Sequence, residues 1–409
     1  MKKRTSFNPL PPLSYKKNKL YFDALSIEAI ARKHPTPFYA YSLKQLHKNF
    51  NTFKQAAIKS GIKNHLICFA LKANANFQIL SQLAKLGSGA DIVSGGELKA
   101  ALKAGIPAHK IVFSGVGKTE QELNLGLQKD ILSFNVESLQ ELELLNFLAK
   151  KKKIKASVAL RLNPHVETKT HKYISTGYKS HKFGILKKEL LSILDHASSF
   201  SAISFDGLSM HIGSQLTELS ATAKAMQELT ECVYLLQDKI KKEISFVDVG
   251  GGLGSPYHPQ DENSIATPLD YMKTVAKNLG KDLISKKIIF EPGRIIAASC
   301  GILVSRVIRT KTSQKNTFVI IDAGMNDLLR PSLYQAYHSI YPASLAKDSK
   351  IIPSHIVGPV CESSDCFASN RPFPMVKADD IVVISDSGAY GHTMSSGYNL
   401  RSQIKEYCY

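Results

Sequence analysis

Between residues 65 and 293 the sequence alternates short apolar segments with amphipathic helix patterns, and this alternation restricts the fold more than any other feature. Eight apolar segments have the length and composition of buried β-strands. They are HLICFAL (65–71), GADIVS (89–94), KIVFSG (110–115), ILSFNV (131–136), SVALRLN (157–163), FDGLSMHIG (205–213), ISFVDVGG (244–251) and KIIFEPG (287–293). Eight such strands separated by helices predict an α/β fold, a (β/α)8 TIM-like barrel. An open, doubly wound sheet remains the alternative, because periodicity does not distinguish the two.

The remainder of the chain has a different sequence pattern. After Arg294, strand-like segments such as GILVSRVIRTK, NTFVIIDAG and DDIVVISDSG follow one another without long helical spacers, which predicts a C-terminal antiparallel β domain. TPFYAYS (36–42) is also strand-like. We therefore expect an N-terminal segment over residues 1–40 that contributes to the β domain, a barrel over 41–293, and the β domain itself over 294–409.

The composition narrows the functional class. A chain of 409 residues with 44% hydrophobic residues can build a large core, and it contains no run of about eighteen apolar residues, so we expect a cytoplasmic protein without a membrane partner. The net charge of +19 comes from lysines spread along the chain, which favours small anionic ligands over nucleic acid. Six scattered cysteines without a CxxC pair indicate neither a disulfide framework nor a zinc site, and no metal is expected.

Polar residues recur where the predicted strands end. In a barrel these ends form one rim, which is the functional face. The residues are Lys72, Asp91, Ser94, Arg161, Asn163, His211, Ser214, the glycines of GGGLG (250–254), and Glu291 to Arg294. We expect them to converge on a single site.

A lysine after a buried strand and a glycine-rich loop after another predict pyridoxal 5'-phosphate as the cofactor. Gly250, Gly251 and Gly252 would let backbone N–H groups approach a phosphate, and Lys72 would form the internal Schiff base, with its pKa lowered by burial beside other cations. Glu291 would keep the pyridine nitrogen protonated, and His211 could stack on the ring. Taken singly, each feature has a simpler reading: a tight turn, a rim lysine, an ion-paired carboxylate, or a core histidine.

The order of these motifs resembles that of the fold-type III, pyridoxal-phosphate-dependent amino-acid decarboxylases, from about Thr36 to Asn399. FALKAN, MHIGSQ, DVGGGLG and EPGR match the family's lysine, histidine, phosphate and pyridine motifs. The resemblance implies an alanine racemase-like barrel and cofactor contacts from Asp91, His211, Ser214, Gly250–Gly252, Glu291, Gly293 and Arg294. After SSGYN the tail NLRSQIKEYCY departs from the family pattern, which leaves the last strand of the β domain in question.

Three later motifs imply the substrate. By resemblance to the family, RPSLYQAYH carries the substrate-binding residues Arg330 and Tyr334, and GPVCESSD carries an acid, Cys361, and a substrate-binding carboxylate, Glu362. GAYG carries Tyr390, which contacts cofactor and substrate in the family. With Arg294, this set implies decarboxylation of meso-2,6-diaminopimelate to L-lysine and CO2. The resemblance also implies a homodimer in which the Cys361 segment completes the partner's site.

Other functions remain open at this stage. Within the same fold they are decarboxylation of ornithine or arginine, and racemisation, which Glu291 disfavours because it makes the ring a strong electron sink. A non-catalytic homologue that binds the cofactor is the alternative outside the enzymes.

Overall fold

The computed structural model describes residues 9–164, 166, 182–258, 260–261, 264–314, 316–346 and 349–409, and the chain divides into two compact units. The first unit comprises Met1–Asn49, Ser255–Ile265 and Ile295–Tyr409, and the second comprises Phe50–Gly254 and Ala266–Arg294. We call them the β unit and the barrel unit.

Within the described residues of the barrel unit, eight parallel strands close into a barrel, as the sequence predicts. They follow the order β9 (Ala156–Asn163), β11 (Ile203–Met210), β12 (Phe246–Asp248), β13 (Lys287–Phe290), β5 (His65–Ala70), β6 (Gly89–Ile92), β7 (Ile111–Phe113) and β8 (Ser133–Val136). Two pairings exclude an open sheet: β13 pairs with β5, and β8 pairs with β9. A short strand, β10 (Ile185–Leu186), extends the sheet beside β9.

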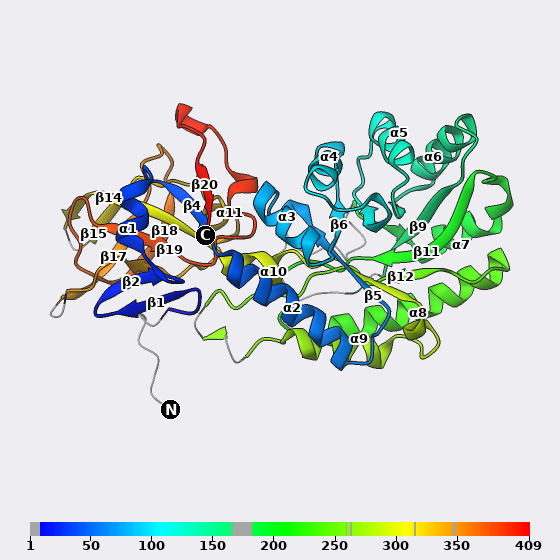
Figure 1. Ribbon diagram of the computed structural model, residues 1–409, viewed down its shortest axis with the longest axis horizontal. Coiled ribbons are helices and arrows are strands. Elements are labelled where there is room, and N and C mark those ends of the chain that lie inside the picture. The colour runs from blue at the N-terminus through cyan, green and yellow to red at the C-terminus, as the bar shows by residue number, and fades with distance from the viewer. Residues whose placement is uncertain are drawn as a thin grey trace. The chain divides into compact units, whose positions relative to one another are not determined.

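Five helices of the barrel unit begin where the sequence supplies a side-chain cap. Asn76, Ser94, Thr119, Ser138 and Thr267 each accept a hydrogen bond from a backbone N–H in the first helical turn. They start α3 (Phe77–Lys85), α4 (Gly95–Lys103), α5 (Glu120–Lys129), α6 (Leu139–Lys151) and α9 (Pro268–Asn278). The helices α7 (Lys187–Asp195) and α8 (Ser220–Ile240), and most of α2 (Leu43–Lys59), also belong to this unit (Figure 1).

The barrel interior is filled by side chains from several strands. Cys68, Val112, Ala159, Phe246 and Ile289 form one buried cluster. Room for the Phe246 ring depends on Gly207 of β11, because a Cβ there would lie 2.4 Å from the ring. The strand pairing between β11 and β9 shifts register at this point, between Phe205 and Gly207.

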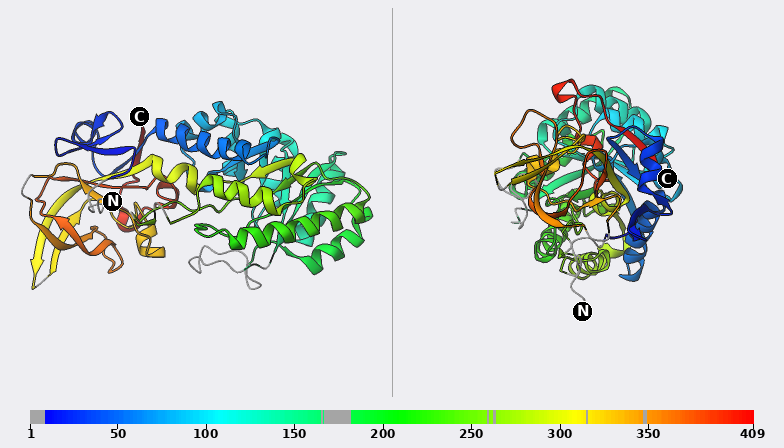
Figure 2. Two further views of the ribbon diagram at one scale, coloured as in Figure 1. Left: turned by 90° about the horizontal axis from the view of Figure 1, so that it is seen from below. Right: turned by 90° about the vertical axis from the view of Figure 1, so that its left-hand side faces the viewer.

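The β unit combines both ends of the chain. Its sheet follows the order β16 (Ile340–Pro342), β19 (Ile381–Ile384), β14 (Gly301–Ser313), β15 (Asn316–Ile321), β17 (Ile351–Val357) and β18 (Cys366–Pro374). The yellow hairpin of β14 and β15 can be followed in Figure 2. From the N-terminal side, β4 (Phe38–Tyr41) joins β14, beside a small sheet of β1 (Leu13–Lys16), β2 (Lys19–Phe22) and β3 (Leu25–Ser26). The helix α1 (Ile27–Lys33) packs into the same core.

The last strand, which the sequence left in question, is present. β20 (Lys405–Cys408) pairs in parallel with β4, and the two lie side by side in Figure 1 as the red and blue strands near the C label. Backbone bonds from Tyr409 N–H to Tyr41 O and from Leu43 N–H to Tyr409 O, both 2.9 Å, continue the pairing.

One expectation for the β unit needs correction, and the extents of the two units differ from the bounds drawn on the sequence. The domain is mixed rather than purely antiparallel, because β15 pairs with β17 in parallel, as β20 does with β4. Residues 41–49 and 255–265 belong to the β unit, whereas the sequence-based bounds placed them in the barrel. Long-range contacts decide this: Asn49 Nδ2 donates to Ile296 O at 2.8 Å, and the Tyr257 ring lies 5.3 Å from that of His338.

We predict that Gly207→Ala destabilises the protein by about 1–3 kcal/mol, the usual cost of overpacking a core. The new methyl group would collide with the Phe246 ring, and thermal unfolding would report the loss. Gly117→Ala is the matched control, because nothing lies within 4 Å of a Cβ at Gly117. Adding Phe246→Leu to Gly207→Ala should restore part of the stability; an unchanged melting temperature in the single variant would contradict the packing argument.

Candidate functional site

Lys72 lies at the rim of the barrel, in the short 3-10 turn that follows β5. Its Nζ donates to Asp91 Oδ2 at 2.7 Å, where Asp91 is fully buried in β6 and the Lys72 side chain is 35% exposed. From the sequence, we expected a buried amine beside other cations. The structure instead pairs the amine with a carboxylate, which favours the ammonium form. The neighbouring strand supplies this partner, and strand spacing does not show it in the sequence.

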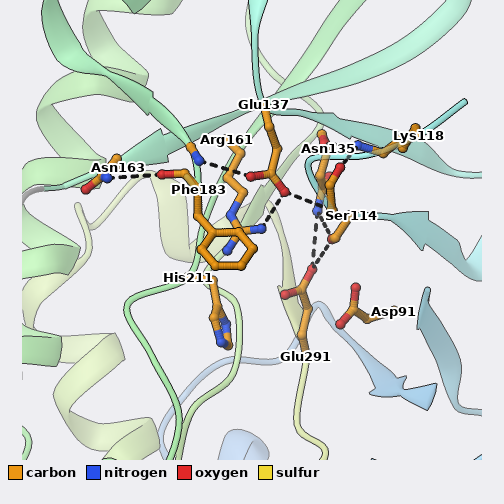
Figure 3. Close-up of polar contacts among 12 residues, drawn as sticks. Asp91, Ser114, Lys118, Asn135, Glu137, Arg161, Asn163, Phe183, His211 and Glu291 are labelled. Carbon is orange, nitrogen blue, oxygen red and sulfur yellow. Dashed lines mark hydrogen bonds and ion pairs between the residues drawn. The ribbon is translucent and has the colours of Figure 1, made fainter. Parts of the chain in front are cut away.

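Two further carboxyls lie buried at the same rim, at the ends of adjacent strands. Asp248 is the last residue of β12, and Glu291 follows β13. Asn135 of β8 joins them: its Nδ2 lies 3.0 Å from Asp248 Oδ2 and 3.2 Å from Glu291 Oε1. Figure 3 shows Asn135, Ser114 and Glu291 in contact, with Asp91 beside them. Because one amide nitrogen reaches both carboxyls, these two groups face each other.

This arrangement keeps a proton on the carboxyl pair. Burial raises the pKa of Asp248 to about 6, although hydrogen bonds from Glu291, Gly250 N–H and Asn135 oppose the shift. Burial, followed by the charges of Asp248 and Asp91, raises the pKa of Glu291 well above its ordinary value. Two carboxylates this close in a buried site do not both ionise readily, so Glu291 donates its proton toward Asp248.

The glycine loop after β12 packs directly on the backbone of its neighbours. A Cβ on Gly250 would lie 2.2 Å from Met210 O, and a Cβ on Gly251 would lie 2.1 Å from Glu291 O. Gly250 also has a positive φ of 69°. Glycine is therefore required here by the fold as well as by any ligand that approaches the loop.

His211 contacts this loop. Its Nδ1 accepts a hydrogen bond from Gly251 N–H at 3.2 Å, so the ring proton of a neutral His211 is on Nε2. Burial, Lys72 and Arg161 lower the pKa of His211 well below its usual value. The imidazole is thus neutral at physiological pH, which suits a ring that stacks on an aromatic cofactor.

Arg294 and Ser214 form the next contact along the rim. The Oγ of Ser214 accepts hydrogen bonds from Arg294 Nε at 3.3 Å and from Arg294 Nη2 at 2.9 Å. Arg294 is buried at the start of α10 (Arg294–Ala297), directly after Gly293. The hydroxyl therefore fixes the direction of the guanidinium from a neighbouring loop.

A buried ionic network surrounds the other side of the rim. Glu137 accepts from Arg161 NH1 at 2.6 Å and from the N–H groups of Gly115 and Gly184 (Figure 3). Lys118, with a fully buried side chain, lies 2.7 Å from Glu141 Oε1 and also donates to two backbone carbonyls. Because its members bind one another and the backbone, this network holds the loops after β7, β8 and β9 in place.

The remaining predicted residues belong to the β unit, which we describe by itself. Arg330, the first residue of α11 (Arg330–Tyr334), is buried, and its guanidinium stacks 4.2 Å from the Tyr257 ring centroid. Tyr334, at the end of the same helix, is half-buried. Tyr390 is half-buried and has a positive φ of 56°, a conformation that non-glycine residues rarely adopt.

Cys361 and Glu362 are exposed at the surface of the β unit. Cys361 N–H donates to Asn399 Oδ1 at 3.1 Å, and Tyr398 OH donates to Glu362 Oε1 at 3.0 Å. Leu400, next to these partners, is completely exposed. A thiol, a carboxylate and a large apolar side chain thus share one exposed region.

The barrel rim fits the expected cofactor. Among the described side chains, Asp91 Oδ1 and Asn135 Oδ1 are buried without a hydrogen-bond partner. They lie with a lysine amine, a neutral imidazole, a glycine loop and an acid proton, which are the groups that a phosphorylated pyridine aldehyde requires.

Several residues of this site escaped the sequence analysis. Asn135 and Asp248 lie inside the apolar runs SFNV and FVD, and Asp248 belongs to a recognised motif without having been given a role. Glu137 and Lys118 were also missed. A polar residue within a buried strand was the available signal, because burying such a group is costly unless it is paired.

Comparison with known proteins places these features in a family. A family model described as "Pyridoxal-dependent decarboxylase, pyridoxal binding domain" matches residues 43–298. The diaminopimelate decarboxylase of Aquifex aeolicus is 41% identical over 397 residues, covering 97% of this chain and 92% of that protein. The diaminopimelate decarboxylase of Helicobacter pylori strain J99 is 43% identical over 380 residues, covering 93% of this chain and 91% of that protein.

Solved structures agree with these matches. The crystal structure of diaminopimelate decarboxylase from Helicobacter pylori complexed with L-lysine has a TM-score of 0.87 and 41% identity, and covers 93% of both chains. The crystal structure of diaminopimelate decarboxylase from M. jannaschii in co-complex with L-lysine has a TM-score of 0.91 and 36% identity, and covers 97% of this chain and 92% of the other.

The described residues show neither a cluster of metal ligands nor a membrane-spanning helix. No group of three or more His, Cys, Asp or Glu side chains is arranged to hold a metal ion. None of the described helices combines the length and apolar character needed to cross a membrane.

The carboxyl pair predicts a specific pH dependence of stability. Burial raises the pKa of Asp248 from the ordinary 3.8 to about 6 in the folded chain, so the folded state binds the proton more tightly. The free energy of unfolding of the cofactor-free protein should therefore fall as pH rises from about 4 through 6, by on the order of 3 kcal/mol from this group. Urea unfolding at several pH values measures this.

Asp248→Asn should flatten that pH dependence, because it removes the titrating group and one charge facing Glu291. The difference from wild type is the readout, since buried Asp327 and Asp386 also have a raised pKa and act in the same direction. Ser114→Ala is the control: it removes a 3.3 Å hydrogen bond to Glu291 but no charge. Parallel pH curves for wild type and Asp248→Asn would refute the shared-proton assignment.

Proposed function

We propose that this protein converts meso-2,6-diaminopimelate to L-lysine and CO2. The chain belongs to the diaminopimelate decarboxylase family of pyridoxal-dependent decarboxylases. The observation that carries this proposal is the barrel rim, where Lys72, His211, the glycine loop and the proton-holding Glu291 come from separate strands. We further infer a cytoplasmic location and no nucleic-acid partner.

The residues of the barrel unit would bind and orient pyridoxal 5'-phosphate. We assign the aldehyde to Lys72, held by Asp91, and the phosphate to Gly250, Gly251 and Gly252, together with Gly293, Arg294 and Ser214. When bound, the cofactor supplies a protonated pyridine ring that accepts the electron pair released with CO2.

Glu291 has the clearest task in this assignment. Its carboxyl group holds a proton in the absence of any ligand, with Asp248 and Asn135 fixing its position. It can therefore present that proton to the pyridine nitrogen. His211 is neutral and is held by Gly251 N–H, so it would add no positive charge at the face of the pyridine ring on which it stacks.

The substrate residues are assigned from the family motifs and the chemistry of the substrate. Meso-diaminopimelate carries a carboxylate and an ammonium group at each end. Arg294 and Arg330 can bind the carboxylate distal to the reaction, because guanidinium groups form bidentate hydrogen bonds with carboxylates. Glu362 can bind the distal ammonium, with contacts from Tyr334 and Tyr390. Loss of CO2 leaves a carbon that must gain one proton, which we assign to the Cys361 thiol.

We infer that the protein acts as a homodimer in which the Cys361 segment completes the partner's site. The exposure of Cys361, Glu362 and Leu400 on the single chain supports this inference. An acid that acts on a buried reaction centre needs to be desolvated, and a second subunit can provide that.

Replacing Lys72 by Ala should abolish turnover and remove the visible absorbance of the bound cofactor, because no other amine is assigned to hold it covalently. The assay is CO2 release from meso-diaminopimelate, with ornithine, arginine and L-lysine as comparison substrates. Lys110→Ala, which removes a half-buried lysine with a 3.4 Å bond to Gly87 O, is the matched control. Full activity of Lys72→Ala, or equal rates with ornithine, would overturn the proposed function.

Cys361→Ala should lower kcat far more than cofactor affinity, since the thiol is assigned only to proton donation. Mixing this variant with Lys72→Ala under conditions that exchange subunits tests the shared site. Mixed dimers have one site with both native residues, so about a quarter of wild-type activity should return. Absence of recovery, with subunit exchange verified, would place Cys361 in its own chain's site; an unchanged kcat would remove it from the acid role.

A further inference from the structure

The side chain of Arg330 is held by His338, a buried residue that no functional motif assigns. Arg330 NH1 lies 2.8 Å from His338 Nε2, and His338 Nδ1 lies 2.8 Å from Ser385 O. His338 is fully buried, and Arg330 is 5% exposed. Three groups from α11, the segment before β16 and the segment after β19 therefore form one short chain of hydrogen bonds.

The chemistry of the two end groups fixes the tautomer of His338. A guanidinium has only donors, so Nε2 of His338 must be the acceptor. A backbone carbonyl has no donor, so Nδ1 must carry the proton. The imidazole is therefore neutral, with Nδ1–H donating to Ser385 O. A neutral acceptor orients the guanidinium without neutralising its charge.

Aromatic packing further restricts the positions of the Arg330 guanidinium and the His338 ring. The Tyr257 ring lies under the guanidinium at 4.2 Å and meets the His338 ring edge-on at 5.3 Å and 68°. The backbone of His338 is anchored as well, because Arg371 NH1 donates to His338 O while its guanidinium stacks 4.1 Å from the Tyr337 ring. Arg330 is thus held on one face by a ring and on one edge by a histidine.

We propose that His338, in its Nδ1–H tautomer, is a positioning residue that aims Arg330 at the substrate carboxylate that survives the reaction. This inference rests on the proposed function, in which Arg330 binds the distal carboxylate. That carboxylate remains in L-lysine, the product. It is absent from cadaverine, which keeps the rest of the L-lysine carbon chain and both amines but lacks the carboxylate.

Two substitutions separate the two hydrogen bonds of the ring. His338→Asn places an amide near the position of Nδ1, so it keeps a donor for Ser385 O but has no acceptor that reaches Arg330. His338→Gln is longer and places a carbonyl oxygen near the position of Nε2, so it keeps an acceptor for Arg330. Gln is therefore the conservative variant that should rescue function.

We expect His338→Asn to raise the KM for meso-diaminopimelate and the Kd of L-lysine about tenfold, with kcat changed less than about twofold and the Kd of cadaverine unchanged. His338→Gln should recover most of the loss. Calorimetric titration of the holoenzyme with L-lysine and cadaverine gives the Kd values, and CO2 release gives the kinetic constants.

The outcomes distinguish a failure of the positioning role of His338 from a failure of the proposed decarboxylase function. If wild-type protein releases no CO2 from meso-diaminopimelate, the proposed function fails. If wild type is active and His338→Asn binds L-lysine normally, or weakens L-lysine and cadaverine equally, the positioning role is refuted. Should His338→Asn not fold, Tyr257→Leu, which removes the ring beneath the same guanidinium, is measured with the same two ligands and the same criteria.

Discussion

Closure of the barrel is the constraint on which the site depends. The pairings β13–β5 and β8–β9 complete a ring of parallel strands, so every strand ends at the same rim. Residues as distant in the sequence as Lys72, Asn135 and Glu291 are neighbours for this reason alone. Without closure, the polar residues at the strand ends would lie along a line, and Asn135 could not reach two carboxyls at once.

Bringing several carboxyl groups together at the rim has an electrostatic cost, and this cost also serves the chemistry of the site. Asp91, Asp248 and Glu291 are all buried at the rim, where separate carboxylates would repel one another. Lys72 offsets Asp91, and a retained proton offsets the charge of the Asp248–Glu291 pair. The same burial that weakens the fold at high pH keeps Glu291 in the protonated form that pyridine chemistry needs. Stability and chemistry are therefore coupled through one buried pair.

The sequence predicted the elements whose signal is local. All eight barrel strands were identifiable because each is a short apolar run between helix patterns, and Lys72, His211, Glu291 and the glycine loop follow those runs directly. Asn135 and Asp248 were missed as functional residues because they lie within the runs and read as part of the strands. Asp91 was predicted as a site residue, but its ion pair with Lys72 was not, since that pairing depends on which strand lies alongside β5.

The sequence also did not reveal how strands that lie far apart in the chain pair with one another. The parallel pairings β15–β17 and β20–β4 join segments far apart in the chain, and nothing in KEYC or NTFVII indicates the direction of the partner strand. Similarly, the inclusion of residues 255–265 in the β unit follows from contacts such as Tyr257 with His338, which no periodicity encodes.

The pairing of β20 with β4 has a consequence for biosynthesis. β4 emerges from the ribosome early, yet one of its two neighbours, β14, follows only after the whole barrel, and the other, β20, comes still later. Because closing so long a loop delays a contact, the barrel can form while the chain is being made, whereas β4 keeps exposed backbone groups until synthesis reaches Lys405. An unpaired strand edge can pair with other nascent chains, so aggregation is most favoured in the interval before β20 arrives.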